Sequence, residues 1–260
     1  MRFTNAVHQT AFFCIIKPIM TEGHYHPITR MNRQINDIFF DLGFEVVDGP
    51  EVEDEWHNFD ALNIPPHHPA RDMWDTFWLK GENPRKLLRT HTSPIQIRHM
   101  EEHGAPVRII APGKTFRNEA TDATHEAQFY QVEGLLIAQD ITMAHLKTTL
   151  TTFFQKLFHA DIHARLRPSY FPFVEPGVEM DISCFLCESK GCRVCKQTGW
   201  IEVLGAGMVH PNVLTNVGLD SAKWQGFAFG GGTDRFAMLK YGIDDVRKLY
   251  TGDLRVVNQF

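Results

Sequence analysis

Four cysteines are crowded into twelve residues, in the pattern Cys184-x2-Cys187-x4-Cys192-x2-Cys195. Each Cys-x2-Cys pair can reach one ion from a tight turn, and two such pairs complete a tetrahedral ligand set. Because four sulfur ligands leave no open coordination position, the pattern predicts a structural metal site, with Zn²⁺ as the expected ion. Free or otherwise paired thiols and an iron–sulfur cluster are the alternatives. The cluster is expected to form a stapled insert, residues 184–195, within a hairpin.

Arg117 and Glu119 stand two residues apart, a spacing that predicts side chains on the same face of a strand. A cation beside an anion suits a substrate with both charges, such as an amino acid together with a nucleotide phosphate. The planar guanidinium of arginine can bind two phosphate oxygens. A surface ion pair is the plainer interpretation.

Phe129, Gln131 and Glu133 alternate, so they share one face of a predicted strand, and His125 precedes them closely. Two polar groups beside an aromatic ring, followed by an apolar run, are unusual for a plain sheet. This pattern favours a binding site, although a solvated strand face stays open as the alternative.

Two further segments combine aromatic rings, glycines and charge. Gly226 to Arg235 predicts a strand that enters a glycine run and a helix with Arg235 in its first turns. Glycine allows close backbone approach, and a helix N-terminus favours an anion. Phe171 and Phe173 could clasp a third ring edge to face, and the nearby Glu175 could hold a metal ion. A ligand-free turn, ordinary core rings and a solvated glutamate are the alternatives.

The elements that would position these residues follow from hydrophobic periodicity and end signals. Helices are predicted from Ile28 to a stop at Gly43, from a Ser93 cap to Gly104, from an Asp140 cap to Phe158, and at 233–241 and 244–250. Strands are predicted at 44–47, 87–88, 107–111, 115–117, 129–137, 163–167, 200–209 and 225–230, with a long loop at 57–85. Because several strands follow one another without a helix between them, we expect an α+β fold with an antiparallel sheet flanked by helices.

The 260-residue chain suits one large domain, with or without a small insert, and its 43% hydrophobic content is enough for a sizeable core. A net charge of −5 is not the footprint of a nucleic-acid binder. If the protein handles RNA, a partner would carry much of that contact. The apolar run 11–16 is too short to span a membrane, and clustered cysteines favour a reducing compartment. We therefore expect a cytoplasmic protein with no membrane association.

Together these segments resemble the class II aminoacyl-tRNA synthetases. Gly43 to Val52, with Pro50, resembles motif 1; residues 116–134 resemble motif 2; and residues 226–238 resemble motif 3. The stretches 89–94, 171–177 and 205–211 narrow the resemblance to the α subunit of the bacterial-type phenylalanyl enzymes. Gly231 and Asp234 depart from motif 3, where a bulky apolar residue and a glutamate are usual.

The resemblance implies roles for the matching positions. For ATP it implies Arg117 at the α-phosphate, Arg235 at the γ-phosphate, His125 near the phosphates and Phe129 against adenine. Around the polar end of phenylalanine it implies His91, Ser93, Glu119, Gln131 and Glu133. Around the phenylalanine ring it implies Phe171, Phe173 and Ala228, with Glu175 helping to bind Mg²⁺. Arg117, Glu119 and Arg235 would be the catalytic residues.

The resemblance also implies a domain organisation, a reaction and a partner. Residues 23–260 would form the catalytic domain, and residues 1–22 a lead-in without the family's N-terminal coiled coil. The chain would activate L-phenylalanine with ATP and transfer it to tRNA(Phe), with a β subunit in an (αβ)₂ assembly. The alternatives are a catalytically inactive paralogue, a zinc-stapled binding module, and a stand-alone organellar-type enzyme. The last carries a further domain after motif 3, whereas this chain ends about twenty residues after Met238.

Overall fold

A seven-stranded sheet organises the computed structural model, which describes residues 23–68, 71, 76–81, 84–159 and 161–260. The strand order is β1-β4-β5-β9-β8-β7-β6. The bounds are β1 Glu45–Val46, β4 Val107–Phe116, β5 Gln128–Ala138, β6 Ala164–Pro168, β7 Val174–Ser183, β8 Trp200–Val209 and β9 Gln225–Gly232. Neighbouring strands pair antiparallel except β1 with β4, so the predicted α+β fold is confirmed with one parallel edge. The lead-in predicted for residues 1–22 lies outside the described residues.

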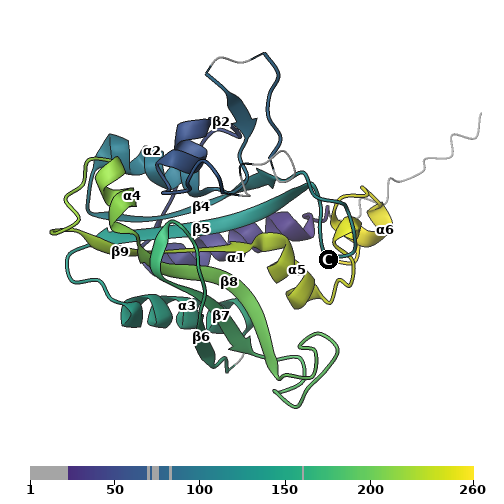
Figure 1. Cartoon of the computed structure of the whole chain (residues 1–260). Coiled ribbons are helices and arrows are strands. Elements are labelled where there is room, and N and C mark those ends of the chain that lie inside the picture. The colour runs from purple at the N-terminus through teal and green to yellow at the C-terminus, as the bar shows by residue number, and fades with distance from the viewer. Residues whose placement is uncertain (1–22, 69–70, 72–75, 82–83, 160) are drawn as a thin grey trace, which may run out of the picture.

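Helices cover both faces of the sheet (Figure 1). Three helices pack in one hydrophobic core on one side of the sheet: α1 Pro27–Asp41, α3 Met143–Phe158 and α5 Thr233–Tyr241. The other side carries α2 Ser93–His103, α4 Pro211–Asn216, the π-helix η1 Trp56–Asp60 and the hairpin of β2 Val52–Asp54 with β3 Lys86–Leu88. Within the described ranges, no helix combines the length and the apolar character that crossing a membrane requires.

Strand β5 shows how the two cores are separated. Val132 and Leu136 face the core built with α1, α3 and α5, whereas Leu135 and Ile137 face the core beneath α2 and α4. This follows from the two-residue period of a strand. Gln131 and Glu133 have the same parity as Leu135, so they open on the side of α2 and α4.

Several predicted elements differ in the structure because pairing overrides local signals. Pro112 and Gly113 predicted a break, yet β4 is one continuous strand that stays in register with β5 through both residues. The loop predicted at 57–85 begins inside the π-helix η1, and the strands on either side of it, β2 and β3, pair with each other. Strand β7 and helix α4 were not predicted. Strand β7 has Pro176 and Gly177 near its start, two residue types that disfavour strands, but β6 and β8 pair with it on both sides.

Helix ends were predicted less well than helix cores. Thr92 is the N-cap of α2 in place of Ser93, while the C-cap at Gly104 is confirmed. Helix α3 is capped by Thr142, whose hydroxyl and backbone form a reciprocal box with His145, and Asp140 stands before the helix at a φ of 61°. Helix α1 has Leu42 as its C-cap, directly before Gly43. The helix predicted at 244–250 is a shorter 3₁₀ helix, η3 Val246–Leu249, followed by α6 Leu254–Val257.

Asp234 ties the sheet to the C-terminal segment. Its side chain is buried and accepts hydrogen bonds from the Tyr130 N–H, at 2.6 Å, and from the Tyr250 hydroxyl. Burial raises the pKa of the Asp234 carboxyl. A Cβ added at Gly231 would lie 2.6 Å from the Phe236 ring, so that ring fills the space of a larger side chain. Both departures from the family pattern are therefore accommodated by local packing.

We expect Tyr250→Phe to destabilise the fold by about 2 kcal/mol, because a buried carboxylate loses a hydrogen-bond donor. Tyr241→Phe is the matched control. The Tyr241 hydroxyl is also buried but has no hydrogen-bond partner among the described residues, so its removal should be neutral or stabilising. Urea unfolding of both variants measures the contrast. Equal losses of unfolding free energy would contradict the role of Tyr250.

Candidate active site

A cavity of about 300 Å³ lies on the side of the sheet that carries α2 and α4. This volume is at the lower end of the range of small-molecule sites. Eight of the residues predicted from the sequence line it, although they come from segments far apart in the chain: His91, Ser93, Arg117, Gln131, Glu133, Phe171, Phe173 and Ala228. The fold therefore brings most of the predicted amino-acid site together.

Glu133 is the polar anchor of the cavity. It is only 6% exposed, and its carboxylate accepts hydrogen bonds from the Thr92 N–H, at 2.9 Å, and from the Ser93 hydroxyl. The Gln96 side-chain amide donates a third, at 3.1 Å. Burial raises the pKa of Glu133, while these donors and Arg117 favour its charged form. The carboxylate thus accepts from the N–H of the N-cap residue Thr92, at a helix end that favours negative charge.

A glycine makes room for this carboxylate. Gly230 of β9 pairs with Glu133 across the sheet, and an added Cβ there would lie 2.8 Å from the Glu133 Cγ. The next pair on the same face is Leu135 with Ala228. The floor of the cavity therefore changes from polar to apolar over two residues of β5, which suits a small ligand with one charged end and one apolar end.

Two aromatic rings cover the apolar end. Phe171 and Phe173 lie nearly parallel, with their centroids 6.0 Å apart and an interplanar angle of 21°. The Phe171 ring rests on the backbone of β8, where a Cβ added at Gly205 would be 2.8 Å from the ring. Both rings line the same cavity, nearly parallel to each other, and their predicted contact with a third ring stays a prediction.

His91 brings an unpartnered imidazole to the cavity. Both ring nitrogens are buried, and among the described residues neither makes a hydrogen bond of normal geometry, although the Asn58 backbone lies near enough to favour the charged ring. Burial, assisted by the nearby Arg117 charge, lowers the pKa of His91 to about 3, so the ring is neutral at pH 7. The buried Gln131 Oε1 is likewise unpaired within the described chain. Buried polar groups are normally satisfied, so both are available to a ligand.

Arg117 supplies positive charge at the cavity edge. Its Nε donates to the Thr90 carbonyl oxygen at 3.1 Å, and its guanidinium lies 5.1 Å from the centroid of the Phe129 ring. Strand β4 ends at Phe116, so the prediction that Arg117 and Glu119 share a strand face was wrong. Glu119 is not among the described residues that line the cavity.

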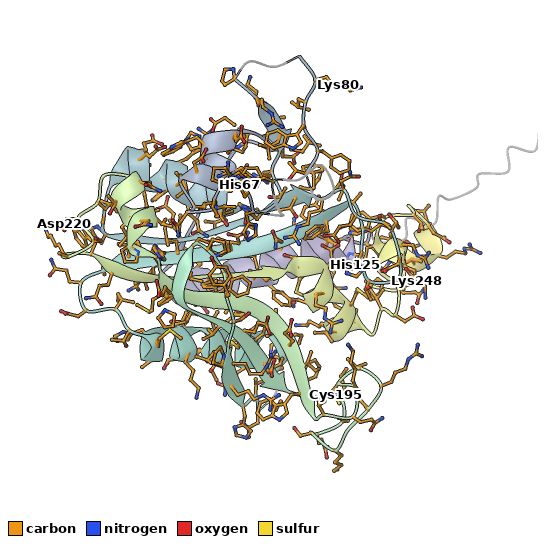
Figure 2. All side chains as sticks on the ribbon, viewed as in Figure 1. His67, Lys80, His125, Cys195, Asp220 and Lys248 are labelled. Atoms are coloured by element: carbon orange, nitrogen blue, oxygen red, sulfur yellow. The ribbon has the colours of Figure 1, made fainter. Side chains whose placement is uncertain are left out.

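Four other predicted residues lie outside the cavity lining, and one of them, Phe129, lies against the Arg117 guanidinium. His125 is exposed on the loop between β4 and β5, 3.0 Å from Asp122 (Figure 2). Arg235 is exposed in the first turn of α5. Glu175 is exposed beside the cavity-lining Val174, with its Oε2 3.3 Å from His210 Nε2. The structure leaves their predicted contacts with ATP and Mg²⁺ as predictions.

Comparison with known proteins agrees with this geometry. The model of the tRNA synthetases class II core domain (F) matches residues 13–260. The phenylalanine–tRNA ligase alpha subunit of Staphylococcus carnosus is 58% identical over 240 residues, 92% of this chain and 67% of that protein. The chain belongs to the phenylalanine–tRNA ligase alpha subunits, within the class II aminoacyl-tRNA synthetases. The alpha subunit of Streptococcus agalactiae is 56% identical over 244 residues, 93% of this chain and 70% of that protein.

A solved structure supports the same fold for this synthetase subunit. The pyrrolysyl-tRNA synthetase from Desulfitobacterium hafniense matches with a TM-score of 0.65 over 88% of this chain and 74% of that chain. The sequence identity is 17%, so this likeness concerns the class II architecture alone.

The cysteine cluster of this synthetase subunit lies in the hairpin between β7 and β8, as predicted (Figure 2). The four sulfur atoms all lie within 4.8 Å of one another, in a group that could hold a metal ion. The N–H groups of Gly191 and Cys192 point at the sulfurs of Cys187 and Cys195, at 3.3 and 3.1 Å. Such donors favour thiolates, so the donor set fits one tetrahedral metal ion.

A repeat that was not predicted lies inside this cluster. The pattern Cys-x2-Cys-x3-Gly occurs twice in succession, and it ends at Gly191 and at Gly199, with φ of 101° and 76°. Each copy closes with the same backbone bond, Ser189 N–H to the Cys184 carbonyl and Gln197 N–H to the Cys192 carbonyl. The insert is therefore two equivalent turns that present their cysteines to a common centre.

A second group of potential metal ligands, Glu53, Asp54 and His57, is not a metal site. The Arg98 guanidinium lies among them, with Nη2 2.6 Å from Glu53 Oε2 and 3.4 Å from His57 Nδ1. A guanidinium in this position makes the group an ion-pair network between β2, η1 and α2.

Arg89, Thr92 and Gln96 support the site but were not predicted. Arg89 is 2% exposed, and its guanidinium donates to the carbonyl oxygens of Gly49 and Lys114, at 2.9 and 2.7 Å. It thereby joins motif 1 to β4 beside the cavity. All three lie within or close to residues 89–94. Their closeness in sequence to the predicted site residue Ser93 was the signal that could have identified them.

His91 should make stability depend on pH. Its pKa is lowered on folding from 6.5 to about 3, so its contribution is complete above pH 6.5 and is lost as the pH falls toward 3. Between pH 8 and pH 5, wild type should lose about 2 kcal/mol of unfolding free energy relative to His91→Gln. Urea unfolding of both proteins at the two pH values measures this. A difference that does not change with pH would contradict the buried, neutral imidazole.

Proposed function

We propose that this chain activates L-phenylalanine with ATP and transfers it to tRNA(Phe), as the α subunit of an (αβ)₂ assembly with a β subunit. The observation that carries the proposal is the change in the cavity floor from Glu133 to Ala228, closed over by two aromatic rings. Membership of the alpha-subunit family supports the reaction and the need for a partner. We also propose that residues 23–260 form the catalytic domain and that the protein is cytoplasmic.

Phenylalanine would lie along β5. Its ammonium group would approach the Glu133 carboxylate and the unpaired Gln131 oxygen, with Ser93 and His91 nearby. Its ring would lie against the Phe171 and Phe173 faces and end at Ala228. An ion-paired ammonium would also favour the charged form of Glu133, whose pKa burial raises. Glu119 would contribute only if its segment moved toward the cavity.

The first chemical step requires positioning more than proton transfer. An oxygen of the phenylalanine carboxylate attacks the α-phosphorus of ATP, forming the P–O bond of phenylalanyl-adenylate while pyrophosphate leaves. Arg117 would face the charge that develops on the α-phosphate, and Phe129, beneath its guanidinium, would stack on adenine. Arg235 and His125 would contact the more distal phosphates. No protein base is needed, because the attacking carboxylate is already ionised.

The second step joins the amino acid to RNA. A ribose hydroxyl of the tRNA attacks the carbonyl carbon of the adenylate, and AMP leaves. Binding tRNA needs phosphate neutralisation, which a chain with a net charge of −5 is poorly suited to provide alone. We therefore assign much of the tRNA contact to the β subunit.

Magnesium would enter with ATP. Glu175 offers one exposed carboxylate beside the cavity, and Mg²⁺ commonly binds one or two carboxylates together with substrate phosphates and water. When bound, Mg²⁺ would neutralise phosphate charge. In the described part of the chain, Glu175 does not belong to a group of three metal-ligating side chains. The phosphates and water would therefore supply most of the Mg²⁺ ligands.

Zinc is the ion we propose for Cys184, Cys187, Cys192 and Cys195. Four thiolates on two equivalent turns match a closed tetrahedral structural site. The ion would hold the tip of the β7–β8 hairpin together without entering the reaction.

Arg117→Ala should reduce phenylalanine-dependent ATP–pyrophosphate exchange by roughly 10²–10³-fold, because one cation is lost from the developing charge at phosphorus. The assay uses the chain assembled with its β subunit. Arg255→Ala is the control, since Arg255 is 90% exposed and pairs only with Asp253 among the contacts described. Absence of exchange in the wild-type assembly would overturn the proposed function in favour of an inactive paralogue. Wild-type rates in Arg117→Ala would remove only that residue's role.

Protein purified without added metal should contain one Zn²⁺ per chain by elemental analysis. Cys187→Ser should lose the ion and lower the unfolding temperature, because a closed site contributes folding energy directly. Ser189→Ala, in the same loop but without a ligand atom in the cluster, should retain both. A metal-free chain of undiminished stability would contradict the zinc site, and iron would identify the alternative cluster.

A further inference from the structure

Three consecutive carbonyl groups hold the two rings of the phenylalanine pocket in place. The Phe171 carbonyl oxygen accepts from the Val174 N–H at 3.3 Å, within its own turn. The Phe173 carbonyl oxygen accepts from the His210 N–H at 3.0 Å, at the end of β8. The Pro172 carbonyl oxygen, between them, accepts from the side-chain amide of Asn63 at 2.7 Å. Only this middle bond comes from a side chain and from the segment after η1.

Asn63 also receives a hydrogen bond. Its Oδ1 accepts from the Asn212 side-chain amide of α4 at 3.0 Å. The chain of amides therefore runs from Asn212 through Asn63 to the Pro172 carbonyl. It joins three segments that each line the cavity, through Leu62 and Ile64, through Phe171 to Val174, and through Val209 and Val213.

The geometry at residue 63 suits asparagine in particular. The backbone has a φ of 58°, in the left-handed region that asparagine tolerates better than most residues. The position also needs a donor toward Pro172 and an acceptor toward Asn212, and an amide provides both. Aspartate tolerates the same backbone but cannot donate when ionised.

We propose that Asn63 is a positioning residue that sets the height of the Phe171–Phe173 rings above the sheet, and so the affinity for phenylalanine. This inference rests on the proposed function, because it assigns these rings to the amino acid. Without the Asn63 donor, the Pro172 carbonyl loses its partner and the middle of the turn is released. Arg117, Arg235 and His125 lie on other elements, and Glu175 follows the Phe171–Val174 bond, which loss of the Asn63 donor leaves in place, so ATP binding should be unaffected.

Helix α4 provides a matched control. The Asn216 side-chain amide donates to the carbonyl oxygens of Asp60 and Ala61, both at 3.2 Å. It therefore joins the same helix to the same η1 segment, but it does not touch the turn that carries the rings. Asn216→Asp removes the same kind of bond and should lower stability without changing phenylalanine binding.

The test measures ATP–pyrophosphate exchange by the full chain assembled with its β subunit. Asn63→Asp should raise the KM for phenylalanine roughly 10- to 100-fold, as expected for displaced binding groups, with the KM for ATP unchanged. Asn63→Gly keeps the backbone conformation and should act in the same direction, so it replaces the aspartate variant if that protein does not fold. Asn212→Asp can accept but not donate, so it should turn the Asn63 amide away from Pro172 and raise the same KM less strongly.

An unchanged phenylalanine KM in both Asn63 variants would overturn the inference while leaving the proposed function intact. Equal effects of Asn63→Asp and Asn216→Asp on this KM would also overturn it, because they would indicate general loosening of α4. A wild-type assembly without phenylalanine-dependent exchange would instead overturn the proposed function, and this inference with it.

Discussion

The buried carboxylate of Glu133 is the interaction on which the rest of the site depends. It comes from the middle of β5 and accepts three hydrogen bonds from the first turn of α2. A buried carboxylate is costly unless its oxygens are satisfied, so the helix end must stay where it is. Ser93 and His91 then lie at the polar end of the cavity because the start of α2 is tied to the sheet.

The same strand separates the binding side of the molecule from its structural side. Residues of one parity pack against α1, α3 and α5, and residues of the other parity line the cavity. Close approach across the sheet requires small residues opposite large ones, as with Gly230 beside Glu133 and Gly205 beneath Phe171. The floor of the cavity therefore has a helical core directly behind it.

The cysteine insert, unlike the cavity, is built from contacts between residues close together in the sequence. It lies at the turn of the long β7–β8 hairpin, whose other end carries the Phe171–Phe173 turn beside the cavity. Its two equivalent turns can be closed by one ion, without a hydrophobic core of their own. The antiparallel pairing of β7 with β8 thus joins the cysteine turns to the turn that lines the cavity.

The sequence alone determined the fold class, the family and eight of the residues that line the cavity, because periodicity and local motifs are properties of neighbouring residues. It also placed the cysteine cluster in a hairpin, since ligand spacing is local. Strand β7, the continuity of β4 and the start of α2 were decided by the tertiary structure, because pairing and long-range hydrogen bonds outweigh local signals. The cap of α3, in contrast, is a local box between Thr142 and His145. Three sets of contacts join residues far apart in sequence. They are the bonds of Glu133 to the start of α2, the ion pair of Arg98 with Glu53, and the hydrogen bonds from Asn212 through Asn63 to Pro172. No local pattern encodes such contacts, because they exist only once the sheet has brought the segments together.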